Sequence, residues 1–193
     1  MGNGPKILAF AGSTRTESFN KKLVRIAVKG ARDAGGDVTL IDLREYPLPL
    51  FDGDLEEREG LPENARKLKQ LFLAHDGLLI SAPEYNGGVT GVLKNTIDWV
   101  SRSEGDEAEL ACFIGKLAAL TSASPGLFGG YRSLLQVRAI LTHIHVLVLS
   151  EQVSVGRALE AFNADGSLKD SKRQAAVEKV GATLVQTLRK LKA

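Results

Sequence analysis

The stretch GSTRTES, residues 12–18, places several phosphate-binding side chains between an apolar run and an expected helix. The hydroxyl donors are Ser13, Thr14, Thr16 and Ser18. Arg15 adds a planar fork that fits a phosphate, and the start of the helix adds N–H groups without partners. Charge-assisted hydrogen bonds contribute about 1.5–3 kcal/mol each, so four or five of them would hold a dianionic monophosphate firmly.

The glycine spacing of this loop excludes two better-known phosphate motifs. The loop lacks the Gly-Lys-Ser/Thr ending of a P-loop, and Gly12 is not followed by the second and third glycines of a dinucleotide fingerprint. A pyrophosphate could not be approached closely by this backbone, so the side-chain donors predict a monophosphate. The alternative is that Ser18 or Thr16 only caps the helix. A cap needs one hydroxyl and explains neither the others nor Arg15.

A second unusual stretch, PEYNGG at residues 83–88, follows a predicted strand. Pro83 ends the strand, Tyr85 supplies an aromatic face, and the Asn-Gly-Gly turn exposes backbone N–H groups. A flat heteroaromatic ring needs this combination of a stacking face and main-chain donors. Taken alone, the stretch is more typical of an ordinary turn.

Strand and helix patterns alternate along the whole chain, and no linker or repeat divides it. The predicted strands are 6–11, 37–43, 77–83, 116–123 and 145–155, and the predicted helices are 18–34, 63–75, 91–103, 127–142 and 171–191. This alternation predicts a single domain over residues 1–193, an α/β fold with a doubly wound five-stranded parallel sheet and helices on both faces. The unusual loops follow the first, third and fourth strands, so a strand order of 2-1-3-4-5 places them at the switch point where ligands bind.

The composition is that of an ordinary globular protein, with 44% hydrophobic and 25% charged residues among 193. A net charge of +2 is too weak to argue for nucleic acid or a membrane surface as a partner, and we expect neither. The single cysteine cannot form an intrachain disulfide, and we find neither a signal peptide nor a run of about 20 apolar residues. We therefore expect a soluble, cytoplasmic protein.

Together, GSTRTESFNKKL and PEYNGGVTGVLKNTIDWVSR resemble the flavodoxin-like NAD(P)H-dependent FMN reductase family, which includes quinone, chromate and azo-dye reductases. Residues 12–20 match the family pattern Gly-Ser-x-Arg-x-x-Ser-x-Asn. Residues 83–86 match Pro-Glu-Tyr-Asn, and residues 91–99 match Gly-x-Leu-Lys-Asn-x-x-Asp-Trp. SASPGLFGGYR, residues 122–132, resembles the Gly-rich loop after the fourth strand of the family.

This resemblance implies FMN as the cofactor and NADPH or NADH as the co-substrate. The residues implied to hold the FMN phosphate are Ser13, Arg15, Ser18 and Asn20. Those implied to line the isoalloxazine, mostly through backbone groups, are Pro83, Glu84, Tyr85, Asn86 and Gly87. Ser122 and Ser124 are placed near the ribityl chain or the ring. Two departures lie in the flavin-facing loop: Thr90 stands where the family usually has Pro, and Gly88 where Ser is common.

The implied reaction passes hydride from NAD(P)H through FMN to a quinone or a similar small acceptor, such as flavin, chromate or an azo compound, by a ping-pong mechanism. Because the flavin carries this chemistry, we expect no catalytic side chain. The resemblance also implies a homodimer or homotetramer. The connection 44–62 is expected to be structureless and to form a rim of the acceptor pocket, with Glu56, Glu57 and Glu59 solvated.

Two other functional classes remain open. A flavodoxin-type electron carrier would bind FMN without substrate turnover of its own, but such carriers tend to be strongly acidic. A nucleotide-binding regulator would bind no flavin. His143 and His145 alternate at the start of a predicted strand, yet no further ligand stands at a supporting spacing, so we expect no metal site. Cys112 is expected to be an ordinary thiol.

Overall fold

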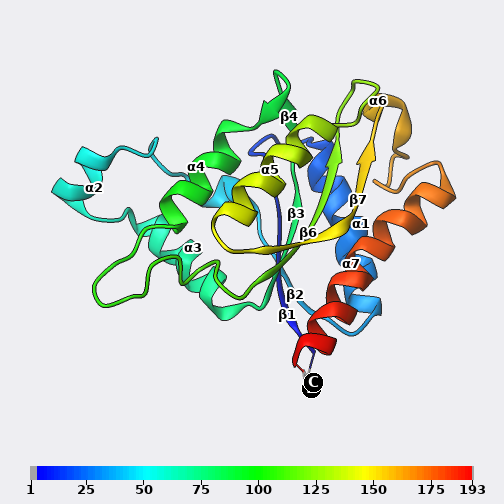
Figure 1. Cartoon of the computed structure of the whole chain (residues 1–193). Coiled ribbons are helices and arrows are strands. Elements are labelled where there is room, and N and C mark those ends of the chain that lie inside the picture. The colour runs from blue at the N-terminus through cyan, green and yellow to red at the C-terminus, as the bar shows by residue number, and fades with distance from the viewer. Residues whose placement is uncertain (1–3, 193) are drawn as a thin grey trace.

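The apolar runs of the sequence form one parallel five-stranded sheet in the computed structural model, which describes residues 4–192 (Figure 1). Its strands are β1 (Lys6–Ala11), β2 (Asp37–Leu40), β3 (Gly77–Ser81), β6 (Leu117–Ala123) and β7 (Leu147–Val155). Their order in the sheet is β2-β1-β3-β6-β7, with every pair parallel. This arrangement confirms the predicted flavodoxin-like fold and the predicted strand order.

Helices cover both faces of this sheet (Figure 1). One face carries α1 (Phe19–Asp33) and α7 (Ser171–Lys192), and the other carries α3 (Glu63–Ala74), α4 (Gly91–Val100) and α5 (Tyr131–His143). Successive residues of a strand point to opposite faces. Ile7 and Ala9 accordingly join the core under α1 and α7, whereas Leu8 and Phe10 join the core under the other three helices. Within residues 4–192, no helix is long and apolar enough to cross a membrane.

Several element boundaries differ from the prediction for identifiable backbone reasons. β2 ends at Leu40 instead of residue 43, because the Asp42 carboxylate accepts a hydrogen bond from the Arg44 N–H (3.0 Å) and caps the short 3-10 helix η1 (Leu43–Glu45). The predicted helix 127–142 begins only at Tyr131, since Gly129 and Gly130 have φ angles of 63° and 85°.

The predicted placement of His143 and His145 on one strand is wrong. His143 is the last residue of α5, and His145 lies in the turn before β7 with a φ of 65°. Besides η1 and the helix described below, three short elements were not predicted: the strands β4 (Glu84–Tyr85) and β5 (Gly88–Val89), which pair antiparallel, and the helix α6 (Ala158–Ala161).

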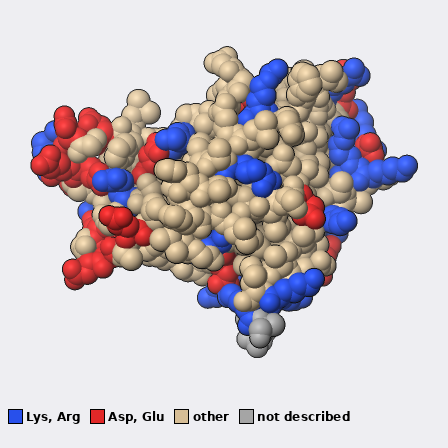
Figure 2. Space-filling model, viewed as in Figure 1, with Lys and Arg blue, Asp and Glu red and all other residues tan. Residues whose placement is uncertain are grey.

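The connection 44–62 is not structureless, as was predicted. It contains η1 and a further helix, α2 (Gly53–Glu59), which projects from the body of the molecule and carries a concentration of Asp and Glu (Figures 1 and 2). The Pro49 carbonyl accepts hydrogen bonds from Trp99 Nε1 and Asn95 Nδ2, both at 2.8 Å. The Phe51 ring packs edge-on against the Trp99 indole, which is fully buried and therefore belongs to the core of this chain.

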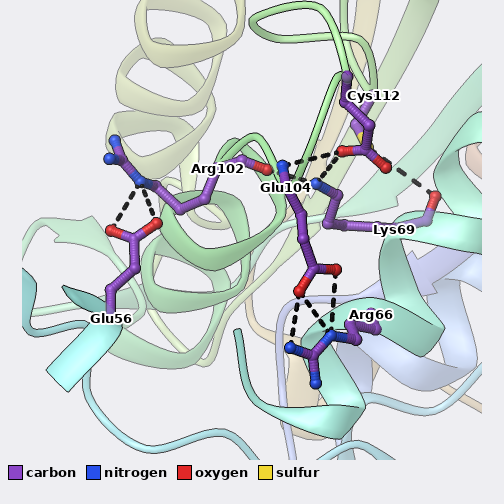
Figure 3. A network of polar contacts seen from close by, with 7 residues as sticks. Glu56, Arg66, Lys69, Arg102, Glu104 and Cys112 are labelled. Carbon is purple, nitrogen blue, oxygen red and sulfur yellow. Dashed lines mark hydrogen bonds and ion pairs between the residues drawn. The ribbon is translucent and has the colours of Figure 1, made fainter. Parts of the chain in front are cut away.

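A network of charged side chains attaches α2 and the segment 103–115 to the helices beneath them (Figure 3). The Arg102 guanidinium donates to Glu56 of α2 (2.8 Å), so the expectation that Glu56 is merely solvated is wrong. Arg66 of α3 donates to Glu104 (2.8 Å). The Lys69 ammonium, with a side chain only 4% exposed, donates to the Glu107 carboxylate and to the Arg102 carbonyl.

Replacing Glu107→Gln should destabilise the fold, because it leaves the buried Lys69 ammonium without its countercharge. We expect the free energy of unfolding, measured by urea denaturation, to fall by about 1–3 kcal/mol. The matched control is Glu63→Gln, which breaks an exposed ion pair with Lys67 on the same helix as Lys69. Its loss should stay below about 0.5 kcal/mol. Equal losses in the two variants would contradict the proposed importance of the buried charge.

Candidate functional site

The first loop leaves β1 beside the end of β3, as the predicted strand order requires. The Gly12 N–H donates to the Ser81 carbonyl (2.9 Å), which fixes the loop to β3 at its first residue. Ser13 is buried and its hydroxyl accepts a hydrogen bond from the Arg15 N–H (3.2 Å). The side chains of Thr14, Arg15 and Thr16 are exposed. The loop therefore offers its guanidinium and two hydroxyls to the solvent side.

The start of α1 offers backbone donors at the end of this loop. Ser18 occupies the N-cap position with an extended backbone, but its buried hydroxyl makes no capping hydrogen bond. A simple hydroxyl cap, the alternative for Ser18, is therefore not what this residue provides. In the part of the chain that the structure describes, residues 4–192, the N–H groups of Phe19 and Asn20 have no acceptor either. These N–H groups lie at the positive end of the helix dipole and suit an anion.

Asn20 has a structural task that the sequence analysis missed. Its Oδ1 accepts hydrogen bonds from the Ser81 hydroxyl and the Ala123 N–H, both at 2.9 Å, and its Nδ2 donates to the Ala123 carbonyl (2.8 Å). The side chain thus ties the start of α1 to the ends of β3 and β6. A primary amide has two N–H groups, so one of them remains for a ligand.

A second guanidinium lies at the first loop. Arg44, in η1, donates a hydrogen bond to the Thr16 hydroxyl. The nearby Lys21 ammonium is buried against Asp42 at 2.6 Å, so its charge is already balanced. No motif in the sequence marks Arg44, because it follows a different strand and reaches the loop only through the pairing of β1 with β2.

The PEYNGG stretch forms the tight β4–β5 hairpin beyond the end of β3. Asn86 and Gly87 have φ angles of 52° and 78°, which is the two-residue pattern that favours Asn-Gly in hairpins. The Gln136 side chain of α5 holds the hairpin, accepting from the Val89 N–H (3.0 Å) and donating to the Gly87 carbonyl (3.2 Å). Tyr85 is 58% exposed beside this turn.

Pro83 and Glu84 hold this hairpin in place. Pro83 is buried two residues after the end of β3. The Glu84 carboxylate accepts hydrogen bonds from the N–H groups of Arg132 (3.0 Å) and Ser133 (3.4 Å), so it caps the N-terminus of α5. The Glu84 side chain is therefore engaged within the protein, and only its backbone is left to face a ligand.

Thr90, which replaces the usual Pro of the family pattern, joins the two loops directly. Its hydroxyl donates to the Gly12 carbonyl (2.7 Å), and both residues are buried. Gly12 also packs against Leu93 of α4, where a Cβ atom on the glycine would lie 2.9 Å from the leucine side chain. The loop after β1 and the loop after β3 are therefore one connected surface.

The two serines after β6 differ in their environment. The Ser122 hydroxyl is fully buried and donates to the Ala82 carbonyl (2.6 Å), so its donor is already used. Ser124 is partly exposed, and its backbone bonds to β7 through the Val155 carbonyl (3.1 Å). Ser124 is the better placed of the two to meet a ligand with its side chain.

Two features that the sequence analysis considered, the connection 44–62 and Cys112, lie mostly away from this edge of the sheet. The connection 44–62 reaches the first loop only through Arg44, while α2 contacts the C-terminal end of α4, opposite the end that the hairpin joins. The rim of an acceptor pocket, expected from this connection, stays a prediction. Burial raises the pKa of the Cys112 thiol to about 11, which keeps it protonated and unreactive at neutral pH.

This parallel sheet, with a hydroxyl-rich loop and an exposed turn at its switch point, defines a flavodoxin-like fold, in which ligands bind at this edge of the sheet. Residues 5–160 match the model of the NADPH-dependent FMN reductase family, and the chain belongs to that family.

Proteins similar to the chain carry related names. It is 33% identical over 193 residues, all of both chains, to an NAD(P)H-dependent FMN reductase of Pseudomonas aeruginosa. It is 32% identical over 155 residues to a quinone reductase of Escherichia coli, covering 80% of this chain and 79% of the relative. Among solved structures, the flavoenzyme NAD(P)H:(acceptor) oxidoreductase FerB of Paracoccus denitrificans superposes with a TM-score of 0.80, at 28% identity, covering 96% and 98% of the two chains.

Replacing Thr90→Val should weaken the connection between the two loops. The variant keeps the side-chain shape but leaves the buried Gly12 carbonyl without its donor, so we expect the free energy of unfolding to fall by about 1–2 kcal/mol. Thr90→Ser keeps the hydroxyl, so its free energy of unfolding should fall by less than half as much as that of Thr90→Val. If both variants unfold at the same urea concentration as the wild type, the hydrogen bond between Thr90 and Gly12 does not stabilise the connection between the loops.

Proposed function

We propose that the chain is an FMN-dependent NAD(P)H oxidoreductase that reduces quinones or similar small acceptors. The observation that carries this proposal is the loop after β1, whose exposed Arg15 and acceptor-free N–H groups at the start of α1 lie at the switch point between β1 and β3, next to the hairpin. The printed names of the relatives, FMN reductase and quinone reductase, support the same cofactor and acceptor class.

The donors of the first loop fit the phosphate of FMN. Ser13, Ser18 and Arg15 supply the side-chain donors that we assign to it, and the N–H groups at the start of α1 are without acceptors in residues 4–192. We assign the remaining N–H of Asn20 to the same phosphate. Arg44, held at the loop by Thr16, adds a second positive charge that attracts a dianion.

The hairpin fits the isoalloxazine ring of FMN. We assign the backbone of residues 83–87 to the polar edge of the ring and the exposed Tyr85 to its surroundings. Glu84 and Gln136 fix the hairpin to α5, so the backbone donors are held before the ring arrives. Ser124, and less directly Ser122, are assigned to the ribityl chain or ring.

Bound FMN would supply the hydride-accepting ring, with nicotinamide and acceptor using its exposed face in turn, as a ping-pong mechanism requires. The chain's own residues bind and orient the cofactor. No protein group needs to donate or remove a proton in hydride transfer, and we assign no catalytic side chain. We further propose a cytoplasmic protein that assembles as a homodimer or homotetramer, as the resemblance to the family implies.

A flavodoxin-type electron carrier is the competing function, and turnover separates the two. We expect FMN-loaded protein with NADPH or NADH and a soluble quinone to oxidise the nicotinamide at a rate on the order of 1–100 per second. The control is free FMN at the same concentration. A rate equal to that of free FMN would contradict the enzyme and favour the carrier.

A further inference from the structure

A cleft of about 550 Å³ lies at the carboxyl ends of β6 and β7, beside the proposed flavin site. One wall is the loop between β6 and α5, and the opposite wall comes from the end of β7 and the start of α7. Its lining residues are Leu127, Phe128, Tyr131, Ser154, Gly156, Arg157 and Arg173. The binding of FMN as proposed above uses none of them.

The cleft is positively charged. Arg157 and Arg173 are exposed, no carboxylate lines the cleft, and neither guanidinium has an ion-pair partner within residues 4–192. A smaller pocket of about 210 Å³ shares both arginines and adds Lys169 together with the carboxylates of Glu160 and Asp170. The Asp170 carboxylate of that pocket is engaged with the first N–H groups of α7. Figure 2 shows Lys and Arg side chains over the edge of the molecule where α6 and the start of α7 lie.

The backbone holds Arg157 at a fixed bend over this cleft. Its φ of 49° lies in the left-handed region, which is uncommon for a residue other than glycine. The Arg157 N–H donates to the Gly126 carbonyl (3.1 Å), and the Arg157 carbonyl accepts from the N–H groups of Glu160 and Ala161, the last two residues of α6. The neighbouring Gly156 lies so close to the Leu127 carbonyl that a Cβ atom would approach it to 2.2 Å. Such strain tends to concentrate at binding sites.

The other wall of the cleft offers aromatic surface. Tyr131 is 45% exposed and Phe128 is 61% exposed, with the Arg132 guanidinium 5.3 Å from the centre of the Phe128 ring. An aromatic face beside two unpaired guanidinium groups suits a purine nucleotide that carries a phosphate. A quinone or a nicotinamide ring carries no anionic group that could pair with either guanidinium.

The position of the cleft relates this nucleotide to the flavin site. Tyr131 is the first residue of α5, and the next two N–H groups of that helix bond to Glu84 in the hairpin. The cleft and the proposed ring site therefore lie on two sides of the same helix start. We propose that the cleft binds the 2′-phosphoadenosine half of NADPH, with Arg157 and Arg173 on its phosphate groups. This inference rests on the proposed function and adds a preference for NADPH over NADH.

Calorimetric binding to the FMN-loaded protein tests the proposal, because FMN then occupies the first loop. The probe is adenosine 2′,5′-bisphosphate, with 5′-AMP as the comparison that lacks the 2′-phosphate. We expect the bisphosphate to bind more tightly than 5′-AMP. Arg173→Gln and Arg157→Asn should each weaken the bisphosphate by about tenfold. Asn tolerates the left-handed backbone at position 157, so that variant should fold.

The matched control is Lys172→Gln, which removes an exposed charge next to Arg173 but outside the cleft lining. It should change the bisphosphate affinity by less than about twofold. In steady-state assays the two arginine variants should lower kcat/KM for NADPH and leave that for NADH unchanged.

Unchanged bisphosphate affinity in both arginine variants would overturn the proposal. A change in oligomeric state on size exclusion, without loss of bisphosphate binding, would also overturn it and assign the cleft to a contact between copies of the chain. Failure of the protein to bind FMN would instead overturn the proposed function. Titrating the bisphosphate into the FMN-free chain would then still test the cleft.

Discussion

The side chain of Asn20 fixes the geometry on which the site depends. It lies in the first turn of α1, yet three hydrogen bonds tie it to Ser81 of β3 and Ala123 of β6. The N–H groups at the start of α1 are thereby held against the carboxyl ends of the two central strands. These three hydrogen bonds are directional, unlike the apolar packing between α1 and the sheet, and they therefore set the position of the helix start relative to β3 and β6.

The loops around this anchor are held by hydrogen bonds between side chains and backbone. Thr90 bonds to Gly12, Glu84 caps α5, and Gln136 holds the tip of the hairpin. Each of these bonds joins segments that are far apart in the sequence. The two loops are therefore held to each other and to α5, and Thr90 donates a hydrogen bond that the Pro of the family pattern could not donate.

The sheet was predictable from the sequence because its inner strands β1, β3 and β6 are largely apolar runs and its unusual loops all follow strands at one edge. The hydrogen bonds of the Asn20 and Glu84 side chains could not be predicted in this way. Their partners lie at the ends of β3 and β6 and at the start of α5, and no local sequence pattern specifies these contacts. The structure of the connection 44–62 was missed for a similar reason. Its α2 has no buried residue and is held by the Glu56–Arg102 ion pair and by the packing of Phe51 on Trp99.

The central claim is that the loop after β1 holds the phosphate of FMN, and comparing FMN with riboflavin tests it most directly. Riboflavin carries the same ring and ribityl chain but no phosphate. Quenching of flavin fluorescence during titration with the purified, flavin-free protein gives both dissociation constants. The account predicts that FMN binds at least about 100-fold more tightly, and that Arg15→Gln removes a large part of this difference. Equal affinities for FMN and riboflavin, or no binding of either, would contradict it.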